Sequence, residues 1–152
     1  MSSASQINER APVVGRSEIE IAAAPDVVWE VLTGIERWPS WNPAVKSASL
    51  EGPVEAGSTF RWKAGPSTIK SRIEDLEKPR RIAWTGTSFG LEAIHVHIFE
   101  PRDGRTLVRT EESFDGMVAR LFHNRLQRAM DSALEGGLRH LKAEAERQER
   151  AA

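Results

Sequence analysis

Residues 91–116, LEAIHVHIFEPRDGRTLVRTEESFDG, decide the fold, because they combine two strand-like stretches, one tight turn and the approach to a helix. The strand-like stretches stand on either side of Asp103-Gly104, a pair typical of the two-residue turns that join antiparallel strands. A turn at this pair places His95 directly opposite Glu112, and opposed residues share one face of a sheet. The sequence therefore predicts a β-hairpin that carries a histidine and a carboxylate side by side.

The interior face of this hairpin is not decided by hydrophobicity alone, because both faces carry apolar residues. One face carries Ala93, His95, His97, Phe99, Val108, Thr110, Glu112 and Phe114, and the other carries Ile94, Val96, Ile98 and Leu107. We assign the first face to the interior, because the strand that bears Glu112 and Phe114 leads directly into the C-terminal helix. A register shift of one residue would reverse this assignment.

Strand-like stretches also fill the chain before the hairpin. Residues 13–21 alternate between two faces, one of them polar, and further strands are predicted at about 45–51, 57–64, 67–77, 80–87, 91–100 and 105–114, with Gly and Pro breaks between them. Pro25 predicts the start of a short helix that ends near Gly34. The Trp-rich connector after it, residues 35–43, contains two prolines. They exclude one regular helix over these residues and allow a single further helical turn.

A long amphipathic helix is predicted from residue 117 to about 148, because apolar residues recur at spacings of three and four. Asp115 is the expected N-cap residue. Beyond Leu141 the apolar stripe ends, so this end of the helix is expected to project into water. The pair Gly136-Gly137 interrupts the helix, which indicates either close packing against another element or room for a ligand.

This order of elements predicts an α+β fold. In it, a curved antiparallel sheet of about seven strands is wrapped around a long C-terminal helix, with two short helices after the first strand. An antiparallel sheet with one apolar face must cover that face, and a single long helix can do so if the sheet curls around it. The space between sheet and helix then either becomes a ligand cavity or is filled by side chains.

Composition limits the class of protein. The chain has 152 residues, with 21 basic and 22 acidic side chains and no cysteine. This length corresponds to one domain, expected at residues 13–148 after a disordered leader at residues 1–12. The near-neutral charge argues against nucleic acid or an anionic membrane as the main partner, since both select a basic excess. Without a secretory signal or a bilayer-spanning apolar run, we expect a cytoplasmic protein with no membrane insertion, and no particular oligomeric state is indicated.

Several motifs resemble those of the bacterial polyketide cyclase/dehydrase (SRPBCC) family, which belongs to the START-like, helix-grip superfamily. They are I-x-A-x-P-x-x-V-W at 21–29, W-P-x-W-N-P at 38–43, I-A-W at 82–84, H-x-H-x-F-E-P at 95–101 and T-x-V-x-x-x-E-x-F-x-G at 106–116. The resemblance spans about residues 14–141 and implies the helix-grip fold. It leaves the activity open, because the family includes binders, transporters and cyclases. In this chain His97 occupies a position where the strand motif has tryptophan.

The predicted His95–Glu112 pair is the candidate chemical centre, and three hypotheses remain open for it. The pair can be a structural ion pair, a polar anchor for a ligand head group, or an acid–base couple in which Glu112 orients His95. A zinc site formed by His95, His97 and Glu112 is a further alternative, because these residue types are zinc ligands. H-x-H on a single strand is a loose pattern with no further ligand evident, so we predict no metal and no cofactor.

Aromatic residues and the polar residues of the hairpin are expected to line the cavity. The tryptophan rings are either core or cavity wall, and Trp38 and Trp41 could instead cap the mouth. The predicted lining consists of Trp41, Phe60, Trp62, Trp84, His95, His97, Phe99, Thr110, Glu112, Phe114, Phe122 and Met130.

Three functions are compatible with these features. The first is binding of a small hydrophobic or aromatic ligand, lipid- or polyketide-like, between the sheet and the C-terminal helix. The second is a polyketide cyclase, aromatase or dehydratase in which His95 is the catalytic acid or base and Glu112 orients it. The third is a protein-interaction module with a closed cavity.

Overall fold

The computed structural model describes residues 5–152, which fold into one sheet and the helices that cover it. The elements are β1 (Val13–Ile21), α1 (Pro25–Thr33), η2 (Ile35–Arg37), α2 (Trp38–Trp41), β2 (Val45–Leu50), β3 (Thr59–Ala64), β4 (Ser67–Glu77), β5 (Arg81–Ser88), β6 (Leu91–Arg102), β7 (Arg105–Asp115), α3 (Met117–Leu121) and α4 (His123–Ala151). The seven strands are antiparallel, in the order β1-β7-β6-β5-β4-β3-β2.

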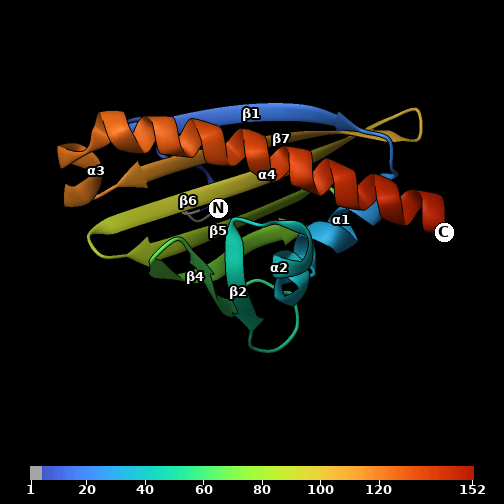
Figure 1. Cartoon of the computed structure of the whole chain (residues 1–152), viewed down its shortest axis with the longest axis horizontal. Coiled ribbons are helices and arrows are strands. Elements are labelled where there is room, and N and C mark those ends of the chain that lie inside the picture. Colours follow the sequence, from blue (N-terminus) through green and yellow to red (C-terminus); the bar gives the residue numbers. More distant parts are fainter. Residues whose placement is uncertain (1–4) are drawn as a thin grey trace.

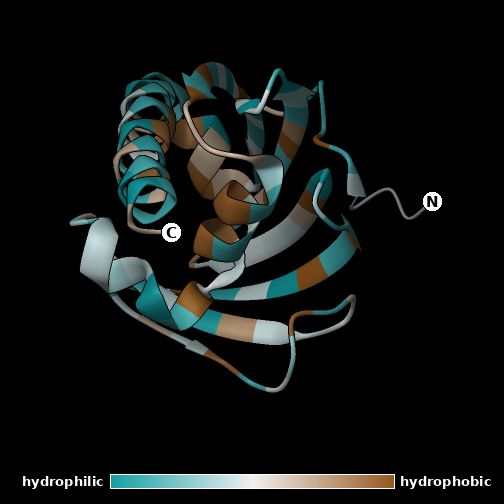
Figure 2. Cartoon of the chain, turned by 90° about the vertical axis from the view of Figure 1, so that its right-hand side faces the viewer, coloured by the Kyte–Doolittle hydropathy of each residue, from teal (hydrophilic) through white to brown (hydrophobic). Residues whose placement is uncertain are grey.

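The sheet curves around an interior that the helices close. In Figure 1, α4 crosses the molecule along β1, and the short helices α1 and α2 lie near its C-terminal half. Figure 2 shows the same arrangement from the end, with the strands curling around one side and α4 along the other. This is the helix-grip fold, and the prediction of a seven-stranded sheet with a long C-terminal helix is confirmed.

The hairpin of β6 and β7 has the predicted turn and register. Asp103 and Gly104 both have positive φ, 51° and 80°, as a two-residue type I′ turn requires. Their turn pairs Arg102 with Arg105, and the same register continues until His95 lies opposite Glu112.

The C-terminal helix differs from the prediction at its start. It is divided into α3 and α4 by Phe122, whose φ of −119° is not helical. Gly116, not Asp115, is the N-cap residue of α3, and the Asp115 carboxylate accepts a hydrogen bond of 2.8 Å from the N–H of Gly116 instead. Gly116 has a φ of 101°, and a Cβ there would clash with the carbonyl oxygen of Gly90. The close approach of two backbones therefore overrides the capping preference of the aspartate.

The far end of α4 packs against the protein instead of projecting into water. Ala145 is fully buried, and the carboxylates of Glu146 and Glu149 accept hydrogen bonds from the N–H groups of Ala22 and Ala24, at 2.8 and 3.1 Å. These N–H groups belong to the link between β1 and α1, where no strand or helix partner satisfies them. The polar C-terminal end of α4 is thus attached to the protein by side-chain hydrogen bonds. A search for a periodic pattern of apolar residues cannot predict such contacts.

The sequence predicts a disordered leader at residues 1–12, of which residues 1–4 lie outside the described part. The described part contacts the sheet: the N–H of Asn8 donates to the hydroxyl of Ser113 at 3.0 Å, and Arg81 donates to the carbonyl of Ser5. These contacts are polar, so hydrophobic periodicity could not predict them. The domain limits of 13–148 stay a prediction.

Two groups of buried side chains make the core. The larger includes Ile21, Val28, Trp29, Phe99 and Leu138, where α1 and the second half of α4 meet the sheet. The smaller joins Val13 to Ala119, Met130 and Leu134. None of the helices described in residues 5–152 has both the length and the apolar character needed to cross a bilayer.

Candidate functional site

A cavity lies between the concave face of the sheet and α4. It has two adjoining halves of about 360 Å³ and about 340 Å³, a size typical of small-molecule sites. We name them the Trp41 half, which extends towards α2, and the Leu91 half, which extends towards the start of β6. Both halves share one set of residues, here called the central section: Trp62, Ala64, Trp84, His95, Glu112 and Ala133.

The strand register brings the polar residues of the hairpin to the central section. Because His95 and Glu112 are paired on β6 and β7, their side chains meet on the concave face, with His95 Nδ1 3.5 Å from Glu112 Oε2. His95 Nε2 lies 2.7 Å from the hydroxyl of Thr110, which is two residues from Glu112 on β7 and therefore on the same face of the sheet. The hairpin thus holds a row of three polar side chains facing α4.

Burial shifts the pKa values of His95 and Glu112 in the directions that favour their uncharged forms. Desolvation lowers the pKa of His95 to about 3 and raises the pKa of Glu112 to about 8. The side chains are only 16% and 14% exposed, and the loss of water outweighs the attraction that their charged forms would have across 3.5 Å. The direction of both shifts favours a protonated carboxyl group beside a neutral imidazole over an ion pair.

A second histidine extends this row. Thr110 Oγ1 lies 3.2 Å from the carbonyl oxygen of Val96, which can only accept, and 3.4 Å from His97 Nε2. With its hydroxyl proton donated to Val96, Thr110 Oγ1 can accept from a neighbouring imidazole N–H. His97 Nδ1 is buried and has no hydrogen-bond partner among residues 5–152. Burial, with a smaller effect from His95, holds the pKa of His97 well below its usual range.

Tryptophan rings surround the polar row. Trp84 stacks on His97 with ring centroids 5.2 Å apart, and its edge contacts His95 at the same separation. Trp62 donates a hydrogen bond of 3.0 Å to the hydroxyl of Ser71, and Trp38 donates one of 2.8 Å to the carbonyl of Leu32. These hydrogen bonds fix the orientation of two cavity rings.

Most of the residues predicted to line the cavity are brought together there. Trp62, Trp84, His95 and Glu112 border both halves, Trp41 and His97 line the Trp41 half, and Phe114 and Met130 line the Leu91 half. Thr110 lies behind the two histidines and contacts them by hydrogen bonding.

Three predicted lining residues lie elsewhere. Phe60 and Phe99 are fully buried in the core, where Phe60 packs edge-on against Trp38 and Phe99 against Trp29. Phe122 lies at the break between α3 and α4 and is 52% exposed. Strand alternation identifies the face of a residue but not its position along the sheet, which decides between core and cavity.

Further lining residues were not predicted as such, and Gly137 is the most informative. It lines the Trp41 half together with Gly136, Trp38 and His140. A Cβ added at Gly137 would meet no atom within 4 Å, and one added at Gly136 would meet only the end of the Arg139 side chain, at 3.8 Å. The hypothesis that these glycines allow close packing is therefore wrong, and the alternative of free space beside the helix is correct.

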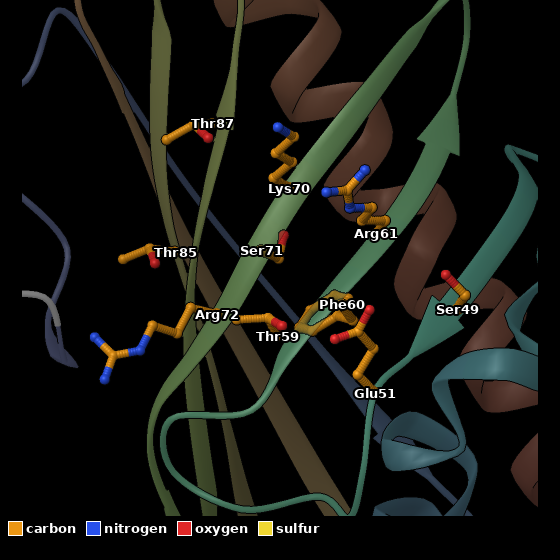
Figure 3. A pocket seen from close by; sticks show the side chains of 10 residues that line it. All are labelled: Ser49, Glu51, Thr59, Phe60, Arg61, Lys70, Ser71, Arg72, Thr85 and Thr87. Atoms are coloured by element: carbon orange, nitrogen blue, oxygen red, sulfur yellow. The ribbon is translucent and has the colours of Figure 1, made fainter.

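A different hollow lies on the outer face of the sheet (Figure 3). Arg61 and Lys70 are paired on β3 and β4, and their side chains line this hollow side by side. Thr85 and Thr87 also line it with hydroxyl groups. Its rim also contains Glu51. This hollow is polar, so it resembles the solvated surface of a sheet more than a site for an apolar molecule.

The zinc alternative receives no support from the geometry. Among residues 5–152, no group of three or more His, Asp or Glu side chains is arranged to hold a metal ion. His95, His97 and Glu112 face one cavity, but two of the three are already engaged with Thr110.

Comparison with known proteins identifies a family whose sequence model matches this chain. The sequence model of the family described as "Polyketide cyclase / dehydrase and lipid transport" matches residues 13–146. No curated protein matches the chain in sequence.

Solved structures match the fold over nearly their whole length. A hypothetical protein from Helicobacter pylori is 19% identical, with a TM-score of 0.81 over 95% of this chain and 99% of that chain. A START superfamily protein from Mycobacterium smegmatis is 14% identical, with a TM-score of 0.78 over 89% and 98%. An aromatase/cyclase from a Streptomyces species is 20% identical, with a TM-score of 0.74 over 89% and 94%. At these identities the likeness concerns the fold alone.

Proposed function

The chain belongs to the polyketide cyclase/dehydrase and lipid transport family, and we propose that it binds a small hydrophobic or aromatic molecule, lipid- or polyketide-like, between the sheet and α4. The observation that carries this proposal is the two-part cavity, whose halves measure about 360 and 340 Å³ and are lined mainly by apolar side chains. Apolar ligand surface moved from water into such a space contributes about 25 cal/mol per Å². His95 and Glu112 serve in this proposal as a polar anchor.

The proposal is tested by titrating the native protein with the uncharged fluorescent dye N-phenyl-1-naphthylamine. We expect saturable binding of one dye per chain and quenching of tryptophan emission, because Trp62 and Trp84 border the cavity. An apolar competitor such as anthracene should displace the dye. If neither the dye nor anthracene binds saturably, the proposal is wrong.

A control is needed because the protein also exposes apolar side chains outside the cavity. Phe89 is 92% exposed, at the turn between β5 and β6, and could bind the dye on its own. The Phe89→Ser variant should leave the stoichiometry and affinity unchanged. Loss of dye binding in this variant would mean that the dye reports the surface and not the cavity.

The second candidate function is catalysis on a polyketide-like substrate. The observation that favours it is the His95–Glu112 pair itself, held 3.5 Å apart in the cavity with His95 also bonded to Thr110. His95 would act as general acid or base and Glu112 would orient it. Glu112→Gln should then lower turnover by about 100-fold or more at unchanged ligand affinity, the scale of general acid–base catalysis. Cyclisation of a linear poly-β-ketone, followed by mass spectrometry for loss of water, is the corresponding assay.

The third candidate, an interaction module with a closed cavity, is the least favoured. It requires side chains to fill the space between sheet and helix. Free space beside Gly137 and on both sides of the central section argues against it.

A further inference from the structure

The polar row of the hairpin lies midway along the cavity. On α4, the lining residues run from Leu126 and Met130 in the Leu91 half to His140 and Leu141 in the Trp41 half, and Ala133 borders both. Ala133 is seven positions from Leu126 and eight from Leu141. At 1.5 Å per residue, the two halves extend about 10 and 12 Å from the central section.

The central section has unused hydrogen-bonding capacity. The carboxyl group of Glu112 has its nearest polar partner, His95 Nδ1, at 3.5 Å, which is too far for a strong hydrogen bond. No described residue forms a hydrogen bond with this carboxyl group. His97 Nδ1 also lacks a partner. A protonated carboxyl group can both donate and accept, so it suits a hydroxyl or a carbonyl group equally.

The cavity lining contains no lysine or arginine to balance an anionic ligand. The three histidines that line the cavity are His95, His97 and His140. A carboxylate or phosphate brought here would lose its water without gaining a cationic partner. A cationic amine would gain Glu112, but both groups would have to be charged in an apolar space, which costs more than their attraction returns unless the geometry is very good.

From this arrangement we propose that the ligand is uncharged and elongated, with two apolar arms and a hydroxyl or carbonyl group near its midpoint that hydrogen-bonds to Glu112. This inference rests on the proposed ligand-binding function and adds the position and charge of the ligand's polar group. Glu112 is the residue that determines this specificity, and the two halves of the cavity receive the two arms.

The test compares two isomeric alcohols, 1,5-diphenylpentan-3-ol and 1,5-diphenylpentan-1-ol, by quenching of tryptophan emission. They contain the same atoms and lose nearly the same hydration, so a difference in affinity reports the position of the hydroxyl group. We expect the central alcohol to bind roughly tenfold more tightly, the scale of one satisfied buried hydrogen bond. The central amine, 1,5-diphenylpentan-3-amine, should bind more weakly than the central alcohol at pH 7.

Two variants locate the effect. Glu112→Leu removes the carboxyl group and keeps an apolar side chain, so the preference for the central alcohol should disappear. Ser132→Ala removes a polar group that lines only the Trp41 half, so the preference should persist. If Glu112→Leu does not fold, the comparison of the two alcohols on the native protein still decides the question.

The outcomes separate this inference from the function on which it rests. If neither alcohol binds, the proposed ligand-binding function is wrong, and the inference falls with it. If both alcohols bind with equal affinity, the function stands and the central polar contact is overturned. Tighter binding of the amine than of the central alcohol would overturn the requirement for an uncharged ligand.

Discussion

Gly137 provides the sharpest test of the cavity, because it lies inside a long helix with free space beside it. A Cβ at this position would meet no atom within 4 Å, and the residue lines the Trp41 half. A glycine in a helix interior costs about 1 kcal/mol relative to alanine. The Gly137→Ala variant should therefore be more stable than the native protein by about 1 kcal/mol, since nothing must move to admit the methyl group.

For a chain of this length, a change of this size corresponds to an increase in Tm of about 2–4 °C. Gly137→Leu should gain at least as much, because leucine is also a good helix former and its side chain enters an apolar space. The leucine side chain would occupy part of the cavity's 360 Å³ half. Ligand affinity should then fall roughly tenfold or more, equivalent to about 1.4 kcal/mol of lost binding free energy.

The assay combines thermal unfolding by circular dichroism with dye or alcohol titration of the same three proteins. Gly137→Ala is the matched control, since it carries the helix effect without filling the cavity. Together the two variants distinguish a change in helix stability from a change in cavity volume.

Two results would refute the reasoning. A lower Tm for Gly137→Ala would mean that the space beside the helix is occupied. An unchanged affinity in a folded Gly137→Leu protein would mean that ligands do not enter the Trp41 half.

Three further predictions concern other parts of the fold. Between pH 6.5 and 8 the native protein should lose up to about 2 kcal/mol of unfolding free energy, because the unfolded Glu112 is already ionised while burial, raising its pKa to about 8, keeps the folded carboxyl protonated. Urea titrations at both pH values should show this loss, and Glu112→Gln should lack it. Gly15→Val should destabilise the protein by about 1–3 kcal/mol in urea, because a Cβ there would lie 2.7 Å from Met130 Sδ. A chain ending at Gly116 should show no cooperative monomeric unfolding by calorimetry and sedimentation, because it lacks α4, which covers the concave face; a folded monomer would contradict the role of α4.

The register of the site could be predicted from the sequence because a local signal controls it. Asp103-Gly104 determines the turn, and the turn determines every pair along β6 and β7, down to His95 opposite Glu112. The number of strands, the long helix and the order of these elements could also be predicted, since each is indicated by the spacing of apolar residues within one segment.

The separation of core from cavity could not be predicted in the same way. Phe60, Phe99 and Trp84 all face the interior by strand alternation, yet the two phenylalanines are core residues and only Trp84 borders the cavity. The sequence shows which face a side chain occupies, but not how far the covering helix stands from it.

By itself, then, the sequence determined the elements, their order and the opposition of His95 and Glu112, all of which follow from short-range periodicity and turn geometry. Only the tertiary structure decided where the space lies. Gly15 brings β1 against Met130 on α4, whereas the same helix leaves Gly137 without a neighbour. A cavity is the distance between surfaces that belong to different segments. No pattern within one segment encodes it, because it results from the packing of all of them together.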